Sequence, residues 1–154
     1  MLLAEALNER ADAQRRLLDL RDRIGANARV QEGEQPAEDP QELLDQAIDV
    51  SERIRVLIVA VNVTNTATRL PDGTTVTAAL ARREALGRRI RVVTEAAKRA
   101  TDKVARWGRA EIREVAVLDV AALRGEADRL AAERRALDAE LQRINWTTEL
   151  AVAI

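Results

Sequence analysis

The sequence contains no cysteine and no histidine among its 154 residues. Disulfide bonds, zinc sites built from Cys or His, haem ligation by His, and Cys or His nucleophile systems are therefore excluded. Phe and Tyr are also absent, and two Trp residues make aromatics 1% of the chain. Because strands favour aromatic side chains, this composition argues against an all-β fold. We expect a protein without catalytic activity, bound metal or cofactor.

The chain also lacks an excess of charge of either sign. Its 25 basic and 26 acidic residues give a net charge of −1, so no overall field attracts nucleic acid or an anionic membrane. The N-terminal residues lack the basic and apolar regions of a signal peptide. The longest uncharged stretch before the C-terminal tail, residues 56–68, is shorter than the roughly 20 apolar residues of a membrane helix. We therefore expect a cytoplasmic, bacterial-type protein with no transmembrane segment and no nucleic-acid partner.

What the sequence does contain is long helical periodicity. Apolar residues at steps of three and four predict helices over about residues 2–25, 40–63, 77–107 and 120–144. Asp39 and Asp119 are predicted N-caps, and the Pro71-Asp72-Gly73 segment predicts a chain reversal. Residues 56–63 are also rich in β-branched side chains, which leaves a core strand as an alternative. Their continuity with the preceding helical pattern favours a helix whose second half is the most buried segment.

Four long helices joined by reversals predict an all-α fold, an antiparallel four-helix bundle forming a single domain over residues 1–154. Alternating apolar residues near 112–117 predict a short strand in residues 111–118. We expect it to pair with residues 27–32 as a two-stranded β-ribbon at one end of the bundle. Residues 32–52 carry a net charge of −8 and residues 82–109 a net charge of +7. Folding the second helix against the third would bring these opposite charges together.

Three arginines interrupt the apolar stripes of three predicted helices: Arg10, Arg83 and Arg134. In a bundle they would lie about 12, 9 and 16 Å from the same end, at 1.5 Å per residue. Their guanidinium groups either extend outward to solvent and neighbouring acids or form a basic layer that binds a carboxylate or phosphate.

Two polar features of the second helix allow further predictions. Asn62 and Asn65 lie one turn apart near its end, where their amides either satisfy nearby backbone or bind a ligand. The hydroxyl of Ser51 is expected to bond to its own helix.

Four segments together carry a family resemblance: Asn27–Gly33, Asn62–Thr68, Leu70–Thr74 and Asn145–Leu150. In this order they resemble the septicolysin-like family of small bacterial proteins. The resemblance implies a protein of unknown function, and the family name suggests a cytolysin, although no catalytic residue carries over. The chain departs from the family pattern in its Arg-rich composition and in its apolar tail, residues 151–154.

These observations favour a non-enzymatic structural or interaction protein that associates with itself, as a dimer or a higher closed oligomer. A second copy of the chain could cover three features that a monomer leaves exposed: the apolar second helix, the apolar tail and the open strand edge. Alternatively, the tail folds back beside Leu3 and Leu7 of its own chain. The alternative functions are an anion-binding module that uses the arginine layer and a membrane-damaging protein.

Overall fold

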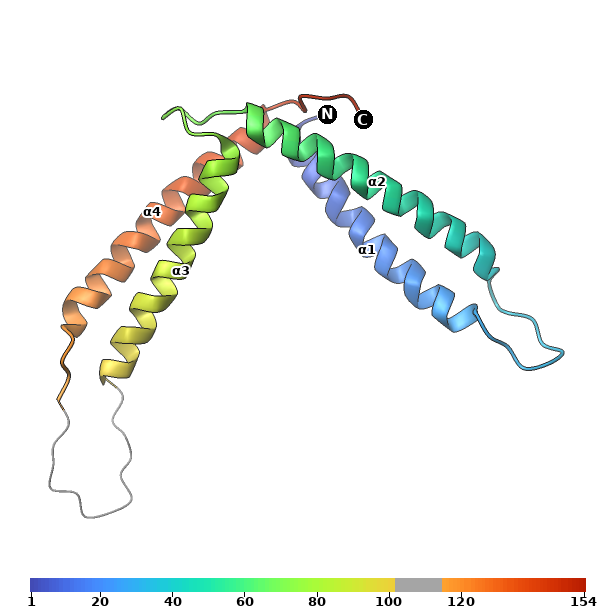
Figure 1. Cartoon of the computed structure of the whole chain (residues 1–154), viewed down its shortest axis with the longest axis horizontal. Helices are drawn as coiled ribbons and strands as arrows, with labels where there is room; N and C mark the ends of the chain where they lie inside the picture. Colours follow the sequence, from blue (N-terminus) through green and yellow to red (C-terminus); the bar gives the residue numbers. More distant parts are fainter. Residues whose placement is uncertain (102–114) are drawn as a thin grey trace, which may run out of the picture. The chain divides into compact units, whose positions relative to one another are not determined.

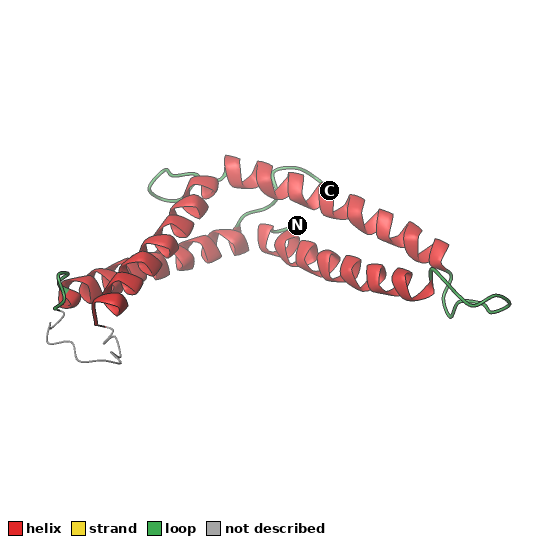
Figure 2. Ribbon diagram, turned by 60° about the horizontal axis from the view of Figure 1, so that its bottom comes forward, coloured by secondary structure: helices red, strands yellow, loops and turns green. Residues whose placement is uncertain are grey.

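Four α-helices make up most of the computed structural model shown in Figure 1, which describes residues 1–101 and 115–154. They are α1 (Leu3–Asn27), α2 (Pro40–Ala67), α3 (Val76–Thr101) and α4 (Val120–Thr147). Within those ranges the structure has no β-strand beyond isolated bridges, and Figure 2 accordingly shows only helices and loops. The all-α prediction is confirmed, and residues 56–63 are helical. The predicted end of the third helix near residue 107 lies outside the described residues.

The helix boundaries follow the predicted capping residues. The Asp39 carboxylate accepts a hydrogen bond from the Gln41 N–H at 2.8 Å, and Pro40 follows at the first helical position, where a missing N–H costs nothing. The Asp119 carboxylate accepts from the Ala122 N–H at 3.0 Å. Both side chains satisfy donors that a helix N-terminus leaves unpaired.

The predicted chain reversal between α2 and α3 is confirmed. Arg69 and Thr75 form an isolated antiparallel bridge across the turn. Gly73 has a φ of 84°, in the left-handed region that side chains other than glycine rarely adopt. The Asp72 carboxylate accepts from the Thr74 N–H at 2.9 Å and closes the turn.

Replacing glycine by alanine should have opposite effects on the free energy of unfolding at two positions. Nothing lies within 4 Å of a Cβ built on Gly125 in α4, so Gly125→Ala should raise the free energy of unfolding by about 0.5–1 kcal/mol. Gly73→Ala should lower it, because alanine is strained at that φ. Urea unfolding measures both changes, and a stability loss in Gly125→Ala would contradict the open space at that position.

The chain divides into two compact units, residues 1–76 with 143–154 and residues 77–142. In unit 1, α1 packs along α2. In unit 2, ion pairs join α3 to α4: Arg82 to Glu133 at 2.7 Å and Arg89 to Glu126 at 3.5 Å. Each unit is thus built on a pair of helices, and the packing of all four helices as one domain stays a prediction.

Two apolar clusters lie along the α1–α2 pair of unit 1. The first contains Leu3, Ala6, Leu57 and Val61, with Leu7 and Leu150 packed against it. The second contains Leu20, Leu43 and Ala47, with Leu17, Ile24 and Val50 packed against it. The second half of α2 is less buried than expected, since Ile58, Val59 and Val63 remain exposed. Within the pair, α1 covers only one side of α2, and a helix that is apolar on all sides needs neighbours on every side to be fully buried.

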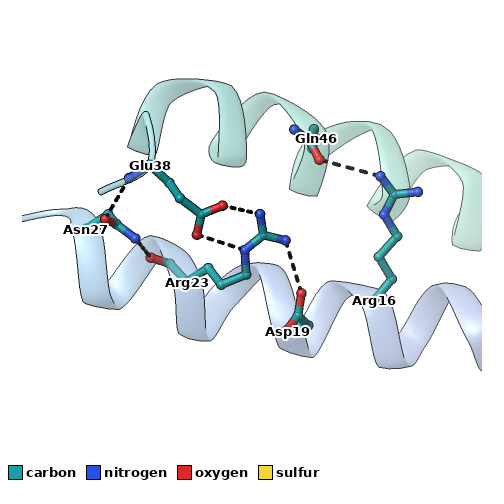
Figure 3. A network of polar contacts seen from close by, with 6 residues as sticks. All are labelled: Arg16, Asp19, Arg23, Asn27, Glu38 and Gln46. Carbon is teal, nitrogen blue, oxygen red and sulfur yellow. Dashed lines mark hydrogen bonds and ion pairs between the residues drawn. The ribbon is translucent and has the colours of Figure 1, made fainter. Parts of the chain in front are cut away.

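The predicted β-ribbon is wrong within the described residues. Asn27 is the last residue of α1, and neither residues 28–32 nor residues 115–118 form a strand; residues 111–114 of the predicted ribbon lie outside the described part. The Asn27 amide donates to the Arg23 carbonyl at 3.0 Å and accepts from the Glu38 N–H at 3.0 Å (Figure 3). The loop therefore closes locally, through side chains, without a partner strand.

An ion-pair network supports the same loop. The Arg23 guanidinium donates to both carboxylate oxygens of Glu38 and to Asp19, the latter at 3.2 Å (Figure 3). Hydrogen bonding from Arg23 lowers the pKa of Glu38 below its usual value. Both side chains are substantially exposed, so solvent screens the pair. The network therefore fixes the path of the loop more than it stabilises the fold.

The C-terminal segment lies beside the N-terminus. The Leu3 N–H donates to the Thr148 carbonyl at 2.8 Å, and the Leu150 N–H donates to the Met1 carbonyl at 3.0 Å. Leu150 also packs on the cluster that contains Leu3. The alternative in which the tail folds back on its own chain therefore describes this segment as far as Ala151, whose N–H donates to the Thr64 hydroxyl at 3.0 Å.

Candidate functional site

The structure brings together two of the three arginines singled out in the sequence. In unit 2, the Arg83 Nη1 lies 3.6 Å from the Asp138 Oδ1, and the Arg134 Nε lies 3.9 Å from the Asp138 Oδ2. Arg83 comes from α3, whereas Arg134 and Asp138 come from successive turns of α4. Arg10 belongs to unit 1. Two arginines of different helices thus share one carboxylate.

These residues line an open groove of about 710 Å³ between α3 and α4. Arg83, Gly87 and Arg91 follow one another at four-residue spacing, so they lie along one face of α3. The Arg134 Cζ and the Arg91 Nη1 lie 3.8 and 3.9 Å from the position that a Cβ on Gly87 would take. We call Arg83, Arg91, Arg134, Gly87 and Asp138 the arginine groove.

Arg10 occupies a stripe position in the α1–α2 pair, as the periodicity predicts. It is half-buried, and its Nε is buried without a hydrogen-bond partner among the described residues. Next to Arg10 in the sequence, the Glu9 carboxylate accepts a hydrogen bond from the Arg53 Nε at 2.6 Å. In the part of the chain that the structure describes, only the Nε of the Arg10 guanidinium is buried without a partner. This fits an arginine whose aliphatic stem lies along the apolar surface while the end of the guanidinium extends to solvent.

Asn62 and Asn65 do not form a shared site. Asn62 is exposed and Asn65 half-buried, and neither amide makes a hydrogen bond within the part of the chain that the structure describes. Thr64, which directly precedes Asn65, is 1% exposed. Its hydroxyl donates to the Ala60 carbonyl at 2.7 Å and accepts from the Ala151 N–H. Sequence reasoning missed Thr64, although its position on the buried stripe of α2 was a usable signal.

Ser51 behaves as predicted. Its hydroxyl donates to the Ala47 carbonyl at 2.7 Å, one turn earlier in α2. This bond satisfies the hydroxyl within its own helix.

One side of the α1–α2 pair carries polar contacts and the other carries exposed apolar side chains. The Arg16 guanidinium donates to the Gln46 amide oxygen at 3.5 Å (Figure 3), which defines the polar side. Leu18 lies two residues from Arg16, and Leu44 and Ile48 lie two residues from Gln46. Two residues correspond to about 200° around a helix, so these three side chains point to the opposite side. We call Leu18, Leu44 and Ile48 the apolar patch.

The apolar patch has opposite charges close to it. Arg21 lies one turn beyond Leu18 in α1, and Asp45 follows Leu44 in α2. Neither has an ion-pair partner among the residues that the structure describes, although the Gln41 amide donates to Asp45 at 2.9 Å. The patch therefore carries one unpaired positive and one unpaired negative group at its edges.

Two kinds of site are not found within residues 1–101 and 115–154. No group of three or more acidic side chains is placed to hold a metal ion. None of the helices in these ranges has the length and apolar character needed to cross a membrane. The arginine groove and the apolar patch are two features from which a function can be argued.

A family model described as "Family of unknown function (DUF6847)" matches residues 10–150. The chain belongs to this family. It is also similar to a crystal structure of a functionally unknown conserved protein from Corynebacterium diphtheriae, with 41% sequence identity and a TM-score of 0.90. That match covers 97% of this chain and 98% of the other. None of the curated proteins compared with the chain matches it. Membership of DUF6847 therefore adds a shared fold and leaves the function to be argued from the geometry.

Proposed function

We propose that this DUF6847 chain is a non-enzymatic helical protein that associates with a second copy of itself through the apolar patch. The observation that carries the proposal is exposure: Leu18, Leu44 and Ile48 are 58%, 43% and 58% exposed on one side of a two-helix unit. Burying such side chains is worth about 1.5–3 kcal/mol each. Because these side chains are exposed in a single copy, their burial against a second copy would favour association by several kcal/mol.

Charge favours a second copy as the occupant of the patch. In a two-fold contact the same surface meets itself, so each residue of one copy faces a residue of the other. Arg21 and Asp45 give this surface one charge of each sign, and a two-fold arrangement can place Arg21 of each copy near Asp45 of the other. A surface with both signs is complementary to itself, which a purely acidic or purely basic surface is not.

The absence of His and Cys supports a role without catalysis. Four of the carboxylates found in ion pairs support it as well, because hydrogen bonds from arginines lower the pKa values of Glu38, Glu52, Glu95 and Glu126. A carboxylate with a lowered pKa stays ionised and is poorly suited to act as a general acid near neutral pH.

Ile48→Lys should weaken self-association at least tenfold, because it places a charge in the centre of an apolar contact that occurs in both copies. Analytical ultracentrifugation of the full chain over a micromolar concentration series measures the dissociation constant. Val92→Lys is the matched control: Val92 is 70% exposed on α3, outside the patch, and its substitution should leave the constant unchanged.

A charge exchange tests the geometry of the contact. Arg21→Glu and Asp45→Arg should each weaken association, and the double variant should recover much of the loss because the two charges are then exchanged. A full-length chain that stays monomeric throughout the series would contradict the proposal. Dye release from liposomes by that monomer would favour the membrane-damaging alternative in its place.

A further inference from the structure

We propose that the arginine groove of unit 2 is a binding site for the phosphate group of a small molecule. The groups that bind the phosphate are the guanidinium groups of Arg83, Arg91 and Arg134. This site lies within one unit and does not involve the apolar patch, so the inference is independent of self-association.

The guanidinium groups of the groove keep unused hydrogen-bond donors. Charge-assisted N–H···O bonds are usually 2.7–2.9 Å long. Arg83 and Arg134 approach Asp138 only to 3.6 and 3.9 Å, which is close enough for attraction but too far for a hydrogen bond. Arg91 has no ion pair among the described residues. Each of the three forks can therefore still donate to a ligand.

Gly87 makes room for two of these forks at one point. The Arg134 Cζ and Nη1 both lie 3.8 Å from its missing Cβ, and the Arg91 Nη1 lies 3.9 Å from it. Glycine inside a helix costs about 1 kcal/mol relative to alanine, so the groove is formed at some expense of helix stability. Two like charges converge over this glycine, since the three heavy atoms nearest to its missing Cβ, apart from the helix backbone and the adjacent residues, all belong to Arg134 and Arg91. An anion at that point would neutralise their repulsion.

The local balance of charge also favours an anion. Glu84 borders the groove, but its carboxylate pairs with Arg88 at 3.1 Å. Arg83, Arg91 and Arg134 then face a single remaining carboxylate, that of Asp138. The groove keeps an excess positive charge of two, which matches the charge of a phosphate monoester near neutral pH.

The geometry of the donors selects phosphate over chloride. A guanidinium presents paired N–H groups in a plane that fits two oxygens of one phosphate. Forks that come from both α3 and α4 can reach different oxygens of the same group. Because the groove is open and holds about 710 Å³, the remainder of a small phosphorylated molecule can extend along it.

Isothermal titration of the full-length chain with inorganic phosphate tests the site. We expect saturable binding that persists when sodium chloride keeps the ionic strength constant. Succinate is a second probe with the same charge and a different shape, and it should bind at least threefold more weakly. Heat that is unsaturable, or that disappears in sodium chloride of equal ionic strength, would overturn the proposal, since it would show general screening of exposed arginines.

Two variants and a control locate the binding. Arg134→Gln should weaken phosphate binding at least tenfold, because it removes one charged fork. Gly87→Leu should do the same without changing any charge, because the side chain fills the point where the forks converge. Leucine is also a good helix former, so α3 is expected to keep its structure, and circular dichroism verifies this.

Arg89→Gln is the control for both variants, because Arg89 lies on the same helix outside the groove lining, and its partner Glu126 also pairs with Arg129. It should change the affinity less than twofold. Equal losses in Arg89→Gln and Arg134→Gln would overturn the site in favour of diffuse attraction. Unchanged affinity in Gly87→Leu would overturn the convergence point over the glycine.

Discussion

Leu57→Ala should lower the free energy of unfolding by about 2–5 kcal/mol, the range for leucine to alanine changes in a packed core. Leu57 is 0% exposed and forms a cluster with Leu3, Ala6 and Val61. The cluster joins α1 to α2 at the end of unit 1 where the two chain termini lie. Removing three carbons there loses apolar burial and leaves a cavity that the surrounding helices fill only in part. Urea unfolding followed by circular dichroism measures the change.

Val59→Ala is the control for this prediction. Val59 lies two residues along the same helix and is 48% exposed, so its truncation should change the free energy of unfolding by no more than about 0.5 kcal/mol. Equal effects of the two substitutions would contradict the burial of Leu57 and the orientation of α2 on α1.

The positions of the helices could be predicted because each depends on local rules. The Asp39 carboxylate and Pro40 mark the start of α2 through capping and a fixed φ, whatever packs against the helix later. Residues 56–63 became helical despite their β-branched side chains, since the apolar stripe continued from the preceding turns. Periodicity over many turns outweighs intrinsic propensity in such a segment.

The β-ribbon could not be predicted correctly because alternation over a few residues is a weak signal. The path of residues 28–38 depends instead on Asn27, whose amide bonds both to α1 and to the Glu38 backbone. These partners lie 11 residues apart in the chain. No periodic pattern connects them, so only the folded geometry shows that the loop closes through this side chain.

The candidate site could be predicted only in part, because part of it also depends on contacts between residues far apart in the sequence. Arg83 and Arg134 stand out in the sequence because each interrupts an apolar stripe. Arg91 interrupts no stripe, and Gly87 resembles any helical glycine. Their role depends on the convergence of side chains from α3 and α4, which is a property of helix packing and not of either helix alone.

Thr64→Val should lower the free energy of unfolding by about 1–3 kcal/mol, although the two side chains have nearly the same shape. The Thr64 hydroxyl accepts from the Ala151 N–H at 3.0 Å and so ties the C-terminal segment to α2. Valine cannot accept this bond, and a partly buried N–H left without a partner has a desolvation cost of that size. The loss should be local to the contact between the C-terminal segment and α2. Amide hydrogen exchange should therefore become faster at Ala151 and Leu150 than in the wild-type chain.

Thr66→Val separates this bond from the general effect of replacing threonine in a helix. The Thr66 hydroxyl donates to the Asn62 carbonyl at 2.9 Å, just as the Thr64 hydroxyl donates to Ala60, but Thr66 is exposed. Its hydroxyl has no contact with the C-terminal segment among the described residues. Thr66→Val should therefore leave stability within about 0.5 kcal/mol of wild type and exchange at Ala151 unchanged. If both variants accelerate exchange equally, the Thr64 hydroxyl does not anchor the C-terminal segment.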